Sequence, residues 1–188
     1  MKSFLHRSGQ GLLIVGALAL GYALLSLVRA DSFQAYQNWV FERSLETGAN
    51  FSQTSVPKPH SVVGRLEVPS LDLSVMILEG VEESELQLGA GHVPGTDLPG
   101  GAGNVVIAGH RDTFFRPLRE LRRNDILTLT TLGGSERYVV ESMRITRPDD
   151  LAVLERGPEP VLTLITCYPF SYIGSAPERF VVRARKLG

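Results

Sequence analysis

The longest apolar run of the chain lies near its N-terminus. Residues 11–28 (GLLIVGALALGYALLSLV) contain no charged side chain, and a run of this length is close to what a helix needs to cross a bilayer. Lys2 and Arg7 precede the run, and Arg29 follows it. Because basic residues concentrate on the cytoplasmic side of membrane helices, the pattern predicts a cytoplasmic N-terminus and an extracytoplasmic chain after Arg29.

A cleaved signal peptide is the alternative for this segment. The tripeptide at residues 28–30 (VRA) is a tolerable small-x-small cleavage site. The apolar run is long for the core of a signal peptide, which favours an uncleaved, single-pass anchor in the cytoplasmic membrane. Both interpretations place the rest of the chain on the extracytoplasmic side.

Beyond the anchor, the spacing of apolar residues predicts an amphipathic helix over residues 31–46. Such a helix can lie on the membrane, pack against the domain or serve as a stalk. Residues 50–60, with two prolines, are typical of an extended linker. We therefore divide the chain into an anchor (1–29), a stem and linker (30–60) and a domain (61–188). The expected apolar positions of the helix are Phe33, Tyr36, Trp39, Val40 and Leu45.

From residue 61 onward, short alternating or β-branched runs predict strands. We expect short helices or helical turns between them and a loop across the glycine-rich residues 89–103. No alternation of strands with long helices is visible. The pattern predicts an all-β fold, a closed or nearly closed β-barrel of seven or eight strands with short inserted helices. The expected strands are 62–68, 71–78, 104–108, 125–132, 137–147, 162–168 and 179–184, and the expected helical turns are 81–88, 114–121 and 148–155.

Composition narrows the classes of function. The chain has 19 basic and 20 acidic side chains and a formal net charge of −1, and no basic patch suggests a nucleic-acid partner. A single cysteine excludes an internal disulfide and a cysteine-cluster metal site. The acidic residues 79, 82, 83 and 85 fit a solvated helical face better than a metal site, so we expect no metal and no cofactor.

Three chemically capable side chains stand at predicted strand ends. Cys167 follows an apolar strand that stops at Pro169, His110 follows strand 104–108, and Arg179 opens the last strand 12 residues after Cys167. A thiolate is a good nucleophile, an imidazole can give and take protons, and a guanidinium can stabilise an oxyanion. We expect the fold to bring these three ends together as the site of a covalent acyl transfer.

Each of these residues also has a structural interpretation. Cys167 can be an inert buried thiol. His110 can be structural, with His92 in the glycine-rich segment as its rival, and Arg179 can be solvated like Arg183, which follows it at strand periodicity.

The segments around these residues resemble a known family. Residues 163–167 (TLITC) resemble the T-L-x-T-C motif of sortases, which are cysteine transpeptidases. Residues 104–118 (NVVIAGHRDTFFRPL) and 167–179 (CYPFSYIGSAPER) resemble the histidine and cysteine-to-arginine segments, most like class D sortases. The resemblance covers roughly residues 60–188. It implies an eight-stranded barrel, with Cys167 as nucleophile, His110 as general acid and base, and Arg179 as the residue that positions substrate and stabilises the oxyanion.

The resemblance also implies partners. The substrate would be a protein with a C-terminal sorting signal of the LPxTG type, and the acceptor an amine on a cell-wall peptide or a pilin lysine. Apart from the resemblance, we expect a groove beside the cysteine strand, lined by Thr166 and by His92 of the glycine-rich loop as substrate contacts. A cysteine hydrolase with water as acceptor, and a non-catalytic binding module, are the alternatives.

Overall fold

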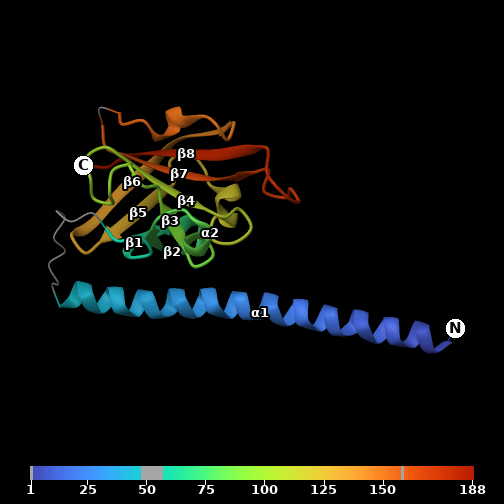
Figure 1. Cartoon of the computed structure of the whole chain (residues 1–188). Helices are drawn as coiled ribbons and strands as arrows, with labels where there is room; N and C mark the ends of the chain where they lie inside the picture. Colours follow the sequence, from blue (N-terminus) through green and yellow to red (C-terminus); the bar gives the residue numbers. More distant parts are fainter. Residues whose placement is uncertain (1, 48–56, 158) are drawn as a thin grey trace.

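The computed structural model describes residues 2–47, 57–157 and 159–188. The chain forms one long helix, α1 (Lys2–Glu46), and a β-barrel that lies along the C-terminal part of this helix (Figure 1). The predicted linker lies for the most part outside the described residues. Its last residues, from Pro57, lead into the first strand of the barrel.

Helix α1 unites two segments that the sequence analysis treats separately. It continues without interruption from the apolar run into the predicted amphipathic stretch. The portion Leu12–Glu46 is long and apolar enough to cross a membrane, and the apolar window within it is not buried against the rest of the protein. An exposed apolar surface of this size needs a non-aqueous partner.

Eight strands close the barrel in the order β1-β2-β3-β4-β7-β8-β6-β5. The pairs β2–β3 and β4–β7 are parallel, and the others are antiparallel. The predicted all-β barrel is therefore confirmed as a mixed, closed, eight-stranded barrel. The strands are β1 (Val62–Val68), β2 (Leu73–Glu79), β3 (Ala90–His92), β4 (Asn104–Gly109), β5 (Ile126–Thr131), β6 (Gly134–Thr146), β7 (Val161–Tyr168) and β8 (Glu178–Lys186).

The connections contain only short helices, as expected. The interpretation of residues 89–103 as a loop throughout is wrong at Ala90–His92, which form β3 between β2 and β4. Two residues of β3 are small, and a strand of three residues shows no alternation. The short helices are η1 (Pro69–Leu71), α2 (Glu83–Leu86), η2 (Arg116–Glu120) and η3 (Leu151–Leu154).

Alternation along the strands separates an inner face from an outer face. The inner residues of β4 are Val105 and Ile107, and those of β7 are Leu162 and Leu164; all four are fully buried in one core cluster. The residues between them, at odd positions of β7 and even positions of β4, therefore belong to the outer face of the barrel.

The C-terminal part of α1 packs against β1 and β2, so of the three expectations for this stretch the structure shows packing on the domain. Phe41 is buried, while Tyr36 and Trp39 of the expected apolar stripe are largely exposed. The contact also has a polar part, because the Gln34 side chain accepts a hydrogen bond from the Met76 amide (2.9 Å) and donates one to the Leu88 carbonyl (2.6 Å).

Arg65 makes a second contact with α1, one to two helical turns after Gln34. Arg65 on β1 donates to Asn38 (2.7 Å) and forms an ion pair with Glu42. Side-chain amides and an arginine thus join α1 to the barrel, in addition to the buried Phe41.

Candidate active site

Cys167 lies one residue before the end of β7, on the outer face of the barrel. Its neighbours Thr166 and Leu164 are inner-face residues, so strand alternation turns the thiol outward. The thiol is free and half-buried. A nucleophile in this position is held by a rigid strand and remains accessible from outside the barrel.

Arg179 is the direct partner of Cys167 across the antiparallel pair β7–β8. Side chains opposite each other in such a pair share one face, with β-carbons about 4.5–5.5 Å apart. The guanidinium donates to the carbonyls of Glu178 (3.0 Å) and Ala176 (3.4 Å). The loop that joins β7 to β8 therefore holds Arg179 on the same face as the thiol.

His110 follows the last residue of β4 on the other side of β7. Gly109 pairs with Thr166, so His110 is level with Cys167, and the alternation of β4 places it on the outer face. Its ring is half-buried, and Nε2 lies 3.6 Å from a carboxylate oxygen of Glu83. Nε2 has no hydrogen-bond partner among the described residues.

The three side chains that the sequence analysis selects thus occupy one end of three adjacent strands, β4, β7 and β8. Neighbouring strands lie about 4.8 Å apart, so His110, Cys167 and Arg179 occupy adjacent positions on one outer face of the barrel. The structure brings together segments that are 57 and 12 residues apart in sequence.

Gly109 allows β4 to end in this position. A β-carbon at Gly109 would lie 2.7 Å from the ring of Phe115, which is fully buried in the core. The Phe115 amide also donates to the His110 carbonyl (3.0 Å). The short turn after β4 is therefore packed over Gly109, and this packing orients the segment that carries His110.

Thr166 has a different place from the one expected. Its side chain is 2% exposed, and its hydroxyl donates to the Gly109 carbonyl (2.7 Å). Thr166 therefore joins β7 to β4 directly beneath the three outer side chains. We assign it to the support of the site rather than to a substrate groove.

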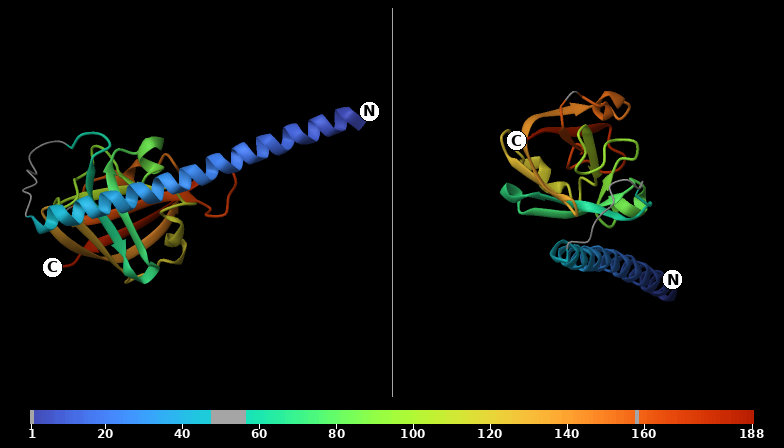
Figure 2. Two further views of the ribbon diagram at one scale, coloured as in Figure 1. Left: turned by 90° about the horizontal axis from the view of Figure 1, so that it is seen from below. Right: turned by 90° about the vertical axis from the view of Figure 1, so that its left-hand side faces the viewer.

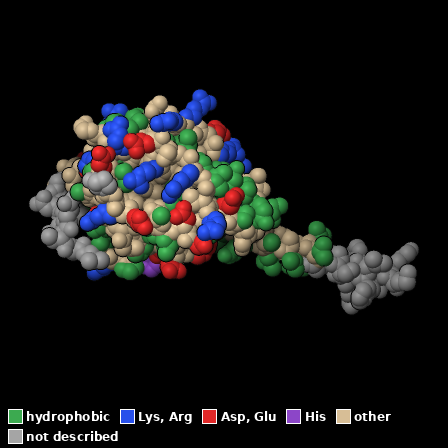
Figure 3. All heavy atoms as spheres, turned by 90° about the horizontal axis from the view of Figure 1, so that it is seen from above, with side chains coloured by type: hydrophobic (Ala, Val, Ile, Leu, Met, Phe, Trp, Pro, Cys, Tyr) green, Lys and Arg blue, Asp and Glu red, His purple; other side chains and the backbone are tan. Residues whose placement is uncertain are grey.

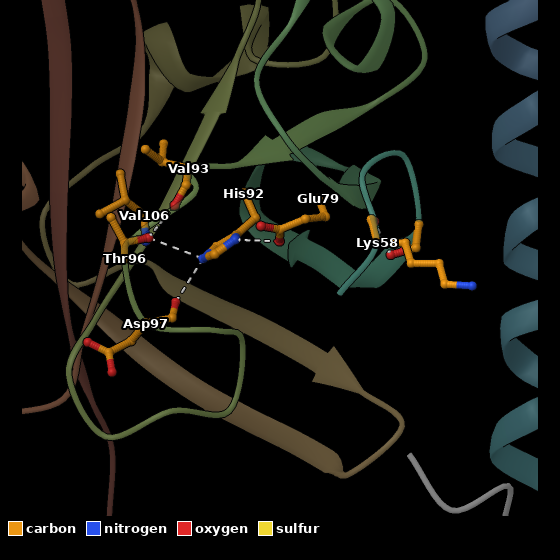
Figure 4. Close-up of polar contacts among 8 residues, drawn as sticks. Lys58, Glu79, His92, Val93, Thr96, Asp97 and Val106 are labelled. Carbon is orange, nitrogen blue, oxygen red and sulfur yellow. Dashed lines mark hydrogen bonds and ion pairs between the residues drawn. The ribbon is translucent and has the colours of Figure 1, made fainter. Parts of the chain in front are cut away.

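His92 is also buried, at the end of β3 rather than in a loop (Figure 4). Nδ1 lies 2.7 Å from a carboxylate oxygen of Glu79, and Nε2 lies 2.9 Å from the Asp97 carbonyl and 3.1 Å from the Thr96 hydroxyl. Both ring nitrogens are used within the protein. The ring therefore connects β2, β3 and the following loop, and its 1% exposure leaves no surface for a substrate.

The expectation of a solvated glutamate face is wrong for two of its four residues. Glu79 and Glu85 are buried, paired with His92 and His60 respectively. The partners lie 13 and 25 positions away in sequence, so no local pattern indicates them. His60, to which the sequence analysis gives no role, pairs with Glu85 of helix α2.

The loop between β3 and β4, which contains Asp97, carries a surface ion pair. Arg156 donates to the Asp97 carboxylate, and this hydrogen bond holds the pKa of that carboxyl below its ordinary value. The pair ties the β3–β4 loop to the segment before β7.

A pocket of about 310 Å³ lies next to this loop, lined among others by Asp97, Leu98, Thr131 and Gly133. Thr131 pairs with the first residue of β6, whereas Arg179 pairs with the last. The pocket is therefore at the opposite end of the barrel from Cys167.

Comparison with known proteins identifies the family to which the chain belongs. The model of the sortase domain matches residues 66–187. The chain belongs to the sortase family, and it is a cysteine transpeptidase of that family.

Individual relatives agree with this assignment. The chain is 35% identical over 132 residues to sortase D of Bacillus subtilis, covering 70% of this chain and 67% of the relative. It is 31% identical over 155 residues to sortase A of Listeria monocytogenes, covering 73% and 69%. A sortase D5 transpeptidase of Clostridium perfringens has the same fold, with a TM-score of 0.68 and 24% identity over 86% of this chain and 99% of that one.

Proposed function

We propose that this sortase cleaves an LPxTG-like C-terminal sorting signal through a thioester on Cys167 and transfers the acyl group to an amine of the cell envelope or of a pilin. The observation that carries the proposal is the arrangement of Cys167, Arg179 and His110 on one face of β4, β7 and β8. Similarity to sortases D and A supports the type of substrate.

The first half-reaction forms the thioester. The Cys167 thiolate attacks the carbonyl carbon of the scissile peptide bond, and the new C–S bond turns the carbonyl into an oxyanion. Arg179, opposite Cys167 in the ladder, stabilises this charge with a forked, permanently charged donor. His110 donates a proton to the departing amine as the C–N bond breaks.

The second half-reaction reverses these roles. The acceptor amine attacks the thioester carbonyl, His110 takes a proton from the attacking nitrogen, and the thiolate leaves. His110 suits this exchange because Nε2 makes no hydrogen bond among the described residues, and its nearest carboxylate oxygen, from the exposed Glu83, lies 3.6 Å away. The product is a new amide bond, and Cys167 returns to its starting state.

We also propose that the chain is a single-pass protein of the cytoplasmic membrane. The exposed apolar stretch of α1 supports an anchor, and the basic residues before it support a cytoplasmic N-terminus. The barrel then lies on the extracytoplasmic side, where sortases act. This position gives the enzyme access to envelope substrates.

Product analysis tests the transfer step. The full chain in detergent or vesicles is incubated with an LPxTG-type peptide and an increasing concentration of an amine such as a short oligoglycine. We expect the ligated product to rise with amine at the expense of the hydrolysed one, and Cys167→Ala to give neither. A hydrolysed product alone at every amine concentration would identify a cysteine hydrolase instead.

A further inference from the structure

The loop between β7 and β8, residues 169–177, exposes apolar side chains next to the proposed site. Ile173 is 97% exposed and Tyr172 is 47% exposed. The loop begins two residues after Cys167, and its last part holds the Arg179 guanidinium. A large aliphatic side chain almost fully in water is unfavourable, so this loop tip needs a partner.

The chain holds this tip in a fixed shape. Nη2 of Arg111 donates to the carbonyls of Tyr172 (2.7 Å) and Gly174 (2.8 Å), which flank Ile173. The same guanidinium lies 5.9 Å from the Tyr172 ring centroid. Gly174 has a φ of +91°, which allows the chain to turn back directly after Ile173. The loop therefore presents Ile173 at its apex.

The direction of the tip follows from the way α1 is attached to the barrel. Gln34, Asn38 and Glu42 hold the helix against β1 and β2, and the helix continues unbroken to its N-terminal half. The views from the front and from below show that the β7–β8 loop lies at the end of the barrel toward which that half projects (Figures 1 and 2). Figure 3 shows hydrophobic side chains gathered at the same end of the barrel surface.

We propose that the tip of the β7–β8 loop, Tyr172 and Ile173, inserts into the interface of the lipid bilayer that α1 crosses. The inference rests on the membrane anchor of the proposed function. A bilayer is the occupant because α1 carries an exposed apolar surface, and the loop tip lies at the end of the barrel toward which this apolar half of α1 projects. A tyrosine beside an aliphatic residue suits the interface, where the ring stays at headgroup level and the aliphatic chain enters the hydrocarbon.

The consequence concerns the proposed site. The loop joins the strands of Cys167 and Arg179, and Arg111 joins it to the residue after His110. Contact with lipid at the tip would orient the mouth of the site toward the bilayer surface. Peptides that are held close to the membrane would then reach the Cys167 thiol without leaving the membrane surface.

Fluorescence quenching by brominated lipids tests the proposal on the full chain in vesicles. The one native tryptophan, Trp39, is changed to phenylalanine, and Ile173→Trp is introduced as the probe. Tyr172→Trp is a second probe should the first perturb the loop. Ser135→Trp is the matched control, because Ser135 is exposed on β6 at the other end of the barrel. All variants retain Cys167.

We expect the tryptophan at 173 to lose most of its emission in brominated vesicles and to shift to the blue, while the tryptophan at 135 keeps its emission. Equal, weak quenching at both positions in a chain that floats with the vesicles would overturn the proposal and leave the anchor intact. A shift at 173 on addition of sorting peptide in detergent, without quenching by lipid, would assign the tip to the substrate instead. Failure of the chain to float with the vesicles would contradict the membrane anchor. The transpeptidase activity is tested separately by the peptide-transfer assay.

Discussion

Arg179 differs from the other arginines of β8 in its partner across the ladder. Arg179 pairs with Cys167, whereas Arg183 pairs with Thr163 and Arg185 with Val161. All three lie on the outer face, because the inner positions of β8 are occupied by Val182 and Ala184. Under the proposed mechanism, the register of each arginine in β8, rather than its residue type, therefore decides which one can reach an oxyanion formed at the thiol.

Replacement of Arg179 tests this distinction. We expect Arg179→Ala to lower kcat by about 10²–10³-fold, the usual cost of losing one oxyanion donor, and Arg179→Lys to recover part of it. The measurement is kcat and KM for peptide transfer. Arg183→Ala is the matched control on the same face, and an equal loss in that variant would contradict a specific role for Arg179.

At the scale of elements, the site depends on how β4 ends. The strand contributes Val105 and Ile107 to the core and ends at the buried Gly109, where Phe115 packs over the position that a side chain would occupy. His110 follows immediately. The packing of one aromatic ring over one glycine thus determines where the imidazole-bearing segment leaves the barrel.

A methyl group at this position should displace that segment. We expect Gly109→Ala to cost about 1–3 kcal/mol of the free energy of unfolding, as for other overpacked cores, and to reduce transfer activity in the protein that remains folded. Chemical denaturation and peptide transfer are the measurements. Phe115→Leu in the same chain should restore part of both, and no recovery would show that the contact between these two residues is not the cause.

The elements differ in how far the sequence predicts them. Seven strands follow from alternating or β-branched runs, and their ends place Cys167, His110 and Arg179 correctly at strand termini. Strand β3 is missed because its three residues, two of them small, carry no alternation. The roles of Thr166 and His92 are not predictable either, since their partners come from other strands and only the closed barrel brings them together.

At the scale of the molecule, α1 and the barrel form one assembly. The Gln34 amide bonds to Met76 of β2 and to Leu88, two residues before β3, just outside the Ile77–Ala90 end of the short β2–β3 ladder. A substituent on Gly89 would collide with the Met76 carbonyl and with Gln34 itself. The helix therefore continues the hydrogen bonding of β2 beyond the β2–β3 ladder and sets the direction of the barrel relative to the proposed anchor.

Loss of this amide should loosen the helix. Each neutral hydrogen bond contributes about 0.5–1.5 kcal/mol, so we expect Gln34→Ala to weaken the docking without unfolding the barrel. Hydrogen exchange at the Met76 amide should become faster. Gln37→Ala, one turn along the helix, is the control, and unchanged exchange in Gln34→Ala would contradict the proposed connection.

The central claim is that Cys167 carries the acyl group, and mass spectrometry of the quenched reaction tests it most directly. The full chain is mixed with an LPxTG-type peptide in the absence of an amine, quenched in acid and digested. The account predicts an added mass, equal to the N-terminal part of the peptide, on the fragment that contains Cys167, and loss of this mass when an amine is added before the quench. Product formation without any adduct on that fragment, or turnover by Cys167→Ala, would contradict it.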